Sequence, residues 1–197
     1  VTNLRSVLVV RSDAPYQTLE EFVKYCQENP GVKLATSGAN GIDDLTARMM
    51  NLKYNTGIVP VAYDSGSEAA LAVLSGECEV ACTSVTGAQT HVEQGKLTVL
   101  CVACDDPDSN YPEYKTAKEL GYDVALNNSI GFAVPAGTDP QIKAILEKFL
   151  ADVTSDPEFV KMYTDMNMSV DYLNAKDFLD LVTNDYNNVK AILDAGA

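Results

Sequence analysis

The sequence predicts an α/β fold, in which helices cover a sheet. Strand-like apolar runs alternate with helical patterns four times between Ser6 and Leu120, which is typical of a parallel sheet with crossover helices. The chain of 197 residues is 46% hydrophobic, enough for a sizeable core, and no apolar run approaches a membrane span.

Turn and capping residues set the order of elements in the first part of the chain. The run at Ser6–Val10 predicts a buried strand, and Thr18-Leu19-Glu20-Glu21 is a capping box that starts a helix reaching about Gln27. Further strands are expected at Val32–Thr36, Gly57–Tyr63, Cys78–Thr83 and Leu97–Ala103. Further helices are expected from Ile42 to about Leu52, from the loop Asp64–Ser67 to Ser75, at Val85–Gln94 and at Thr116–Leu120.

After Asn127 the pattern becomes mainly helical. A short strand is expected at Ser129–Val134, and helices begin at Pro140 (capped by Thr138 or Asp139), at Asp156-Pro157 and at Asn174. Two strands, one entering and one leaving, therefore bracket the α/β layer, as they do at the hinge of a two-lobed binding protein.

Charge and cysteine content exclude several classes. The formal net charge is −14 and basic runs are absent, which argues against nucleic acid and anionic membranes as partners. The five cysteines lack the spacing of zinc knuckles and His91 is the only histidine, so we expect neither metal nor cofactor. Four of them, Cys78, Cys82, Cys101 and Cys104, lie in strand-like runs. We favour free thiols in the core, and a disulfide remains the alternative.

Three strand ends share one chemistry. Each is followed by hydroxyl side chains, glycine and a helix start, and the carboxyl ends of parallel strands meet at one edge. Helix starts offer unpaired N–H groups to an anion, and the first corner lacks P-loop and G-x-G-x-x-G spacing, so a small carboxylate is expected. A turn that only reverses the chain is the alternative at any single corner. The candidate ligand-binding residues are Thr36, Ser37, Gly38, Asn40, Gly41, Tyr63, Ser65, Gly66, Ser67, Thr83 and Ser84.

Six segments in register carry a family resemblance. In order they read LVVRSDAPYQTLEEFV, NPGVKLATSGANG, VPVAYDSGSEAALAVLSGECEV, HVEQGKLTVLCVA, YPEYKTAKELGYDV and GFAVPAGTDPQIKAIL. Together they resemble the extracytoplasmic solute receptors of the tripartite tricarboxylate transporter family, often called Bug-type receptors.

The resemblance implies a type II periplasmic-binding-protein fold without catalytic activity. Two α/β lobes would close on a small carboxylate, and the receptor would deliver it to the membrane transporter subunits. The location would be extracytoplasmic, in the periplasm or lipid-anchored at the cell surface, with no export signal in this chain. Residues 1–128 would be the second α/β lobe with a hinge strand. Residues 129–197 would be the other hinge strand and the C-terminal helical part of the first lobe.

The sequence also departs from the family pattern. Asp64 stands where members often have lysine, which suggests an amino-acid ligand as an alternative to a plain carboxylate, and Asp43 and Asp44 stand where small polar residues are common. A further N-terminal segment of the family is absent, so we interpret the chain as a fragment. Its C-terminal helices are expected to pack on each other, on the hinge strand Ser129–Val134, or across a homodimer.

Two other classes of protein are alternatives. The effector-binding domain of a LysR-type transcriptional regulator shares this fold class and length, an analogy of fold only. A hydrolase would need a nucleophile, a base and an oxyanion site, and His91 is interpreted as an exposed helix residue. The six segments favour the transport receptor over both.

Overall fold

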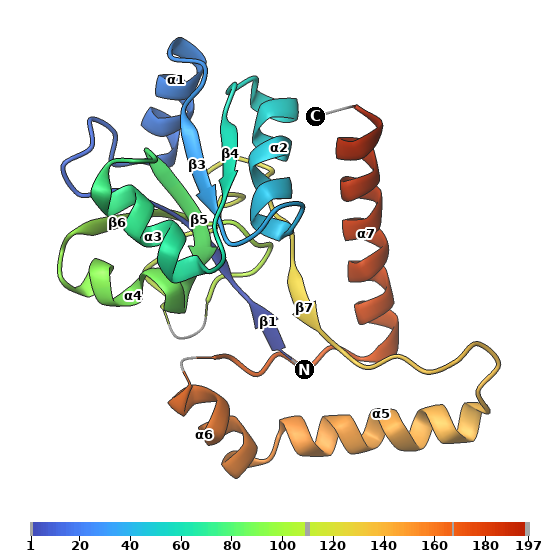
Figure 1. Ribbon diagram of the computed structural model, residues 1–197. Coiled ribbons are helices and arrows are strands. Elements are labelled where there is room, and N and C mark those ends of the chain that lie inside the picture. The colour runs from blue at the N-terminus through green and yellow to red at the C-terminus, as the bar shows by residue number, and fades with distance from the viewer. Residues whose placement is uncertain (1, 109–110, 167, 196–197) are drawn as a thin grey trace.

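The computed structural model describes residues 2–108, 111–166 and 168–195 and confirms the α/β class (Figure 1). Its main sheet has five strands in the order β4-β3-β5-β2-β6. These strands are β2 (Ser6–Arg11), β3 (Lys33–Thr36), β4 (Val59–Ala62), β5 (Val80–Ser84) and β6 (Leu97–Val102). Strand β3 lies between β4 and β5 and runs parallel to both, so the carboxyl ends of these three strands lie at one edge.

The prediction of a wholly parallel layer is wrong for β2. This strand is antiparallel to both of its neighbours, β5 and β6. The chain enters the layer through a hinge at the edge where β3, β4 and β5 end, so its first strand must run away from that edge. Alternation of strands and helices along a sequence does not reveal such a reversal.

Helices cover both faces of the sheet. On one face, α1 (Leu19–Glu28) and α2 (Ile42–Tyr54) pack on the side chains of Leu8, Val10 and Leu34. On the other face, α3 (Gly66–Ser75) and α4 (Val85–Glu93) pack on Val7 and Val9. Side chains alternate between the two faces of a strand, and each large buried one contributes roughly 1.5–3 kcal/mol. The capping box expected at Thr18 and Glu21 is present at the start of α1.

Two short strands lie beside the main layer, where the sequence predicts a hinge. Strand β1 (Thr2–Leu4) leads into the layer and pairs antiparallel with β7 (Asn128–Ile130), which leads out of it (Figure 1). The expected strand at Ser129–Val134 is therefore shorter and begins one residue earlier, because β1 offers only three partners. The short helix expected at Thr116–Leu120 is a series of turns, in which Thr116 and Glu119 exchange side-chain and backbone hydrogen bonds.

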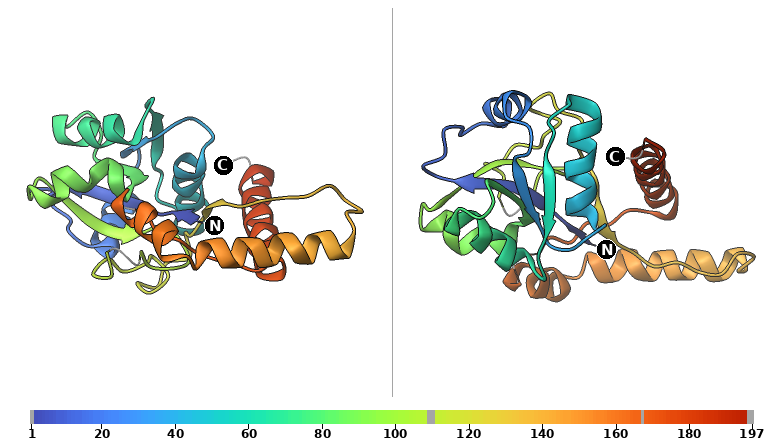
Figure 2. Two further views of the ribbon diagram at one scale, coloured as in Figure 1. Left: turned by 90° about the horizontal axis from the view of Figure 1, so that it is seen from below. Right: turned by 45° about the horizontal axis from the view of Figure 1, so that its top comes forward.

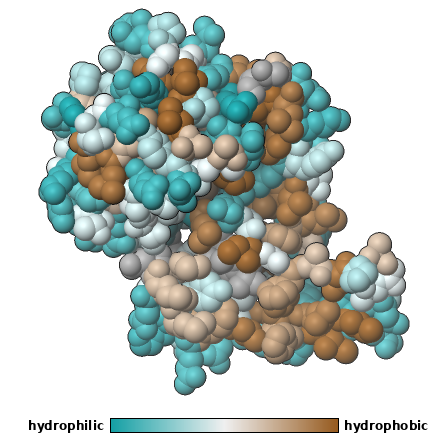
Figure 3. Space-filling model, viewed as in Figure 1, coloured by the Kyte–Doolittle hydropathy of each residue, from teal (hydrophilic) through white to brown (hydrophobic). Residues whose placement is uncertain are grey.

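The C-terminal part consists of α5 (Pro140–Thr154), α6 (Pro157–Asp165) and α7 (Ala175–Asp194). Asp139, Asp156 and Asn174 cap them, at the predicted starts. Helix α7 stands beside α2, whereas α5 projects away from the sheet (Figures 1 and 2). Ile192 of α7 is buried in the core, but Phe149 of α5 remains 60% exposed. The space-filling view shows apolar surface along α5 (Figure 3). Among the described helices, none combines the length and apolarity needed to cross a membrane.

All five cysteines are buried in the structure without a disulfide. Burial raises the pKa of the Cys101 thiol to about 12 and that of Cys104 to about 11. A thiol needs a lowered pKa to act as a nucleophile at neutral pH, so these residues serve the core.

Candidate functional site

The strand register brings the three predicted corners to one edge of the sheet. We call residues 36–41 the first corner, 63–67 the second and 83–84 the third. Thr36 at the end of β3 pairs with Ala62 of β4 on one side and with Cys82 of β5 on the other. Neighbouring strands lie about 4.8 Å apart, so a molecule of a few atoms can bridge these strand ends. This edge is the candidate site.

The first corner is closed by its own hydrogen bonds. The buried Thr36 hydroxyl donates to the Gly38 carbonyl at 3.2 Å, and the exposed Ser37 hydroxyl donates to the Asp43 carboxylate. Asn40 has a φ angle of 59°, and its N–H donates to Asp44. The loop is thereby fixed against the first turn of α2, whose N-cap is Gly41.

Asp43 connects this corner to the sheet. Its carboxylate also accepts hydrogen bonds from the Ser6 hydroxyl at 2.7 Å and from the Cys82 thiol at 3.5 Å. The neighbouring Asp44 pairs with Arg48 at 2.9 Å. Both carboxylates are buried in the first turn of α2, where their negative charge interacts favourably with the positive end of the helix dipole.

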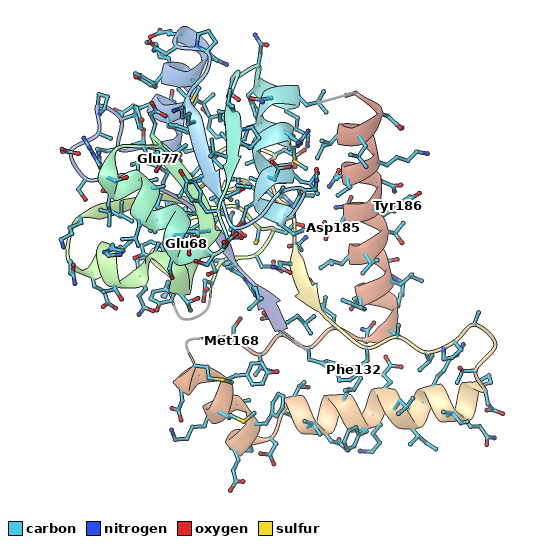
Figure 4. All side chains as sticks on the ribbon, in the orientation of Figure 1. Glu68, Glu77, Phe132, Met168, Asp185 and Tyr186 are labelled. Atoms are coloured by element: carbon cyan, nitrogen blue, oxygen red, sulfur yellow. The ribbon has the colours of Figure 1, made fainter. Side chains whose placement is uncertain are left out.

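The second corner leads into α3. Ser65 is the N-cap of α3 and its hydroxyl accepts from the Glu68 N–H at 3.2 Å. The Glu68 carboxylate in turn accepts from the Asp64 N–H, and Figure 4 labels Glu68 on the first turn of the helix. Ser67 is exposed, and the structure gives its hydroxyl no protein partner among the described residues. This hydroxyl is available to a ligand.

Tyr63 points elsewhere. Its hydroxyl lies 3.5 Å from the sulfur of Cys78, which precedes β5 at the end opposite the candidate edge. That contact raises the pKa of the Tyr63 phenol. In this structure the Tyr63 hydroxyl therefore faces Cys78, and its backbone is the part that lies at the second corner.

The third corner joins two helix starts. Ser84 caps α4, accepting from the Gly87 N–H at 3.2 Å, and lies 3.1 Å from the Thr86 hydroxyl. The fully buried Thr83 hydroxyl has no hydrogen-bond partner among the residues that the structure describes. It is packed between Gly66, at the start of α3, and Gly87, in the first turn of α4. The first turns of α3 and α4 therefore converge around Thr83.

Three residues outside the candidate ligand-binding list shape this edge. Ser6 and Asp43 tie the first corner to the sheet, and Gly87 lets α4 approach α3. Ser6 belongs to a run that predicts a buried strand, and Asp43 stands out in the sequence only as a departure from the family pattern. A glycine in the third position of a helix carries no sequence signal of its own.

The edge lacks the groups that hydrolysis needs. The three corners contain no histidine, cysteine, lysine or arginine. His91 lies near the C-terminal end of α4 and is half-buried rather than exposed as expected. Hydroxyls and helix N–H groups are what the corners offer, and these bind a ligand without activating it.

Comparison with known proteins extends this description. The model of the tripartite tricarboxylate transporter family receptor matches residues 1–197. A curated relative from Cupriavidus necator, a UPF0065 protein, is 27% identical over 188 residues, covering 95% of this chain and 57% of the relative. A solute-binding protein from Polaromonas superposes with a TM-score of 0.90 at 22% identity, over 98% of this chain and 67% of that one. MatC from Rhodopseudomonas palustris, solved with bound malate, gives a TM-score of 0.68 at 18% identity, over 98% and 66% of the two chains.

These findings confirm the type II periplasmic-binding-protein fold, and the matched family is one of transport receptors rather than enzymes. They give the regulator alternative no support. The chain spans between about half and two thirds of the length of the proteins it matches.

Proposed function

The chain belongs to the tripartite tricarboxylate transporter receptor family, and we propose that it binds a small carboxylate at the edge where β3, β4 and β5 end. The observation that carries this proposal is the convergence of the α3 and α4 first turns around the unpartnered Thr83 hydroxyl. Unpaired N–H groups at two helix starts, next to serine and threonine hydroxyls, form an environment that favours an anion.

Hydrogen bonds rather than salt bridges would hold the ligand. The three corners carry no basic side chain, and Arg48 is already paired with Asp44. Each neutral hydrogen bond contributes roughly 0.5–1.5 kcal/mol net, and somewhat more when the acceptor is ionised. The malate of MatC is a ligand of the chemistry that such an edge would accept.

Family membership supports the wider role. We propose that the protein works outside the cytoplasm and hands its ligand to a membrane transporter of the tripartite tricarboxylate type. We also propose that residues 1–128 form one lobe with its hinge strand. Residues 129–197 then return to the other lobe, and ligand would be held between the two.

The test is a titration of the ¹⁵N-labelled chain with succinate, malate and adipate, followed by NMR. We expect amide shifts at Gly66, Ser67 and Ser84. Ser67→Ala should weaken binding by about tenfold or less, because it removes a hydroxyl that is not committed elsewhere. Ser37→Ala should have a smaller effect, because the Ser37 hydroxyl already donates to Asp43. Ser75→Ala is the matched control, since Ser75 lies at the opposite end of α3 and its hydroxyl donates to the Ala72 carbonyl.

Binding weaker than about 10 mM by all three acids, with no shifts at the corners, would overturn the proposal. Unchanged affinity in both serine variants would remove these two hydroxyls from the site.

A further inference from the structure

We infer that the hollow between α4 and residues 111–114 receives an arginine side chain presented by a partner protein. This hollow opens beside β6, the edge strand of the main sheet, whereas the proposed ligand site lies where β3, β4 and β5 end. The inference therefore goes beyond the proposed function and does not depend on it. Three features of the hollow carry it: the size, the aromatic wall and the surrounding charges.

The hollow is small and its floor is apolar. Its volume is about 170 Å³. Pockets for metabolites usually measure roughly 300–1,000 Å³, so this one suits a single side chain. The floor is made by Val7 of β2, Val99 of β6, and Val85 and Ala88 of α4. Such a floor can bury the methylene groups of a long basic side chain while its charged head stays at the rim.

Two half-buried tyrosines form one wall of the hollow. The rings of Tyr111 and Tyr114 are stacked, with centroids 5.8 Å apart and an angle of 13° between their planes. A backbone hydrogen bond of 3.1 Å, from the Tyr114 N–H to the Tyr111 carbonyl, holds both residues in one turn. The face of a tyrosine ring attracts a cation, and the planar guanidinium group of arginine also stacks on it, which the ammonium group of lysine cannot do. The wall therefore favours arginine.

The charges around the hollow are negative. Glu93 and Glu113 line it, and among the residues that the structure describes no lysine or arginine does. Burial raises the pKa of the Tyr114 phenol, and the carboxylates of Glu113 and Glu93 raise it further. The Gln89 amide donates a hydrogen bond of 2.8 Å to Glu93 and thereby restrains this carboxylate. Guanidinium forms strong, often paired hydrogen bonds with carboxylates, so this rim suits the head of an arginine.

The arginine has to come from another protein. Each arginine of this chain is already paired with a carboxylate, and the pairs are Arg5–Asp171, Arg11–Asp13 and Arg48–Asp44. A second copy of the chain therefore offers no uncommitted arginine. The net charge of −14 attracts a partner with a basic surface and speeds their encounter.

The experiment titrates two matched peptides into the ¹⁵N-labelled chain and follows the amides by NMR. Both peptides are short and blocked at their ends, and they differ only in the central residue, which is arginine in one and its neutral analogue citrulline in the other. We expect the arginine peptide to shift the amides of Glu93, Tyr111 and Tyr114 and to bind about tenfold more tightly than the citrulline peptide. Its binding should weaken as the salt concentration is raised to about 1 M. Equal binding of the two peptides, or no shifts at these residues up to about 10 mM arginine peptide, would overturn the inference.

Substitutions in the hollow and away from it locate the attraction. Glu93→Gln keeps the size of the side chain and removes its charge, so it should lower the arginine-to-citrulline affinity ratio about three- to tenfold. Tyr114→Leu removes an aromatic face and should lower the ratio as well. Glu28→Gln is the matched control, because Glu28 is an exposed carboxylate at the end of α1, on the opposite face of the sheet. If Glu28→Gln lowers the ratio as much as Glu93→Gln does, the net charge rather than the hollow attracts the peptide, and the inference is wrong.

Discussion

The Oγ1 atom of Thr83 lies only 2.2 Å from the point that a Cβ atom on Gly66 would occupy. The same oxygen lies 2.7 Å from the corresponding point on Gly87. Both separations are shorter than any real contact to a Cβ atom, so only glycine fits at either position. The close approach of α3 and α4 depends on these two missing side chains.

Gly66→Ala should destabilise the protein by about 1–3 kcal/mol, because the added methyl group overlaps a short, buried side chain. Urea unfolding followed by circular dichroism measures the change. Adding Thr83→Ala removes the obstructing oxygen and should recover at least about 1 kcal/mol, a coupling expected of residues in contact.

Gly41→Ala is the control for the added methyl group. A Cβ atom there meets only the Gly38 carbonyl oxygen, at 3.7 Å. We expect it to cost less than about 1 kcal/mol, as exchanges at a helix N-cap do. Additive effects of Gly66→Ala and Thr83→Ala would contradict the contact.

Local signals in the sequence predicted most elements but not the contacts between them. Asp139, Asp156 and Asn174 identify the starts of α5, α6 and α7, because capping is decided within one turn. The direction of β2 depends on its pairing with strands distant in the chain. The hydrogen bond from Ser37 to Asp43 depends on how the two side chains are oriented. The three corners could be predicted because parallel strands end at one edge. The orientation of the Tyr63 hydroxyl toward Cys78 could not be predicted, because a tyrosine in a loop can turn either way.

Asp43→Ala should destabilise the protein by about 1–3 kcal/mol, because it leaves the buried Ser6 hydroxyl without its acceptor and also releases Ser37 and Cys82. Asp43→Asn keeps one acceptor oxygen and should lose less. Thermal unfolding of the two variants checks this order, and equal losses would show that the hydrogen bonds contribute little.

Asp185→Asn should stabilise the protein at pH 7. Burial raises the pKa of the Asp185 carboxyl, the hydrogen bond from Asn127 lowers it, and the nearby charge of Asp105 raises it. Asp185 lies on the side of α7 that faces the α/β layer, whereas Tyr186 points away from it (Figure 4). Asp105 itself lies 3.8 Å from the ammonium group of Lys118.

The sign follows from proton binding. A raised pKa means that the native state binds the proton more readily than the unfolded chain. The stability from Asp185 is therefore present below its unfolded pKa of about 3.9 and is lost as the pH rises through the native value. The gain from Asp185→Asn should be below about 1 kcal/mol at pH 7, since the group is partly exposed, and absent at pH 3. Asp180→Asn, which only breaks the exposed pair with Lys176, should give no gain at either pH.

The five thiols should be unreactive in the folded protein. Burial raises the pKa of the Cys26 thiol to about 12, as it does for Cys101, so little thiolate is present at pH 8. Ellman's reagent should detect few thiols in the native chain and all five after unfolding in guanidinium. Rapid reaction of any thiol in the native state, or fewer than five after unfolding, would contradict this arrangement.

The C-terminal helices should make this 197-residue chain self-associate. Phe178 packs on Gly131, in the segment Ser129–Val134 on which these helices are predicted to pack. Ile192 is buried against the α/β layer, a contact that the sequence does not predict. However, Phe132, Ile145 and Phe149 are 69%, 68% and 60% exposed. Phe132 and Phe149 line a groove of about 440 Å³ between α5 and residues 131–134, and Ile145 lies on the same helix as Phe149. An apolar surface of this kind on a monomer favours association.

Light scattering across a concentration series should therefore show oligomers, and Ile145→Lys with Phe149→Lys should shift the chain toward monomer. Leu71→Lys, at an exposed leucine on α3, should leave the distribution unchanged. A chain that stays monomeric at every concentration, with no binding of a hydrophobic dye, would show that this surface does not drive association.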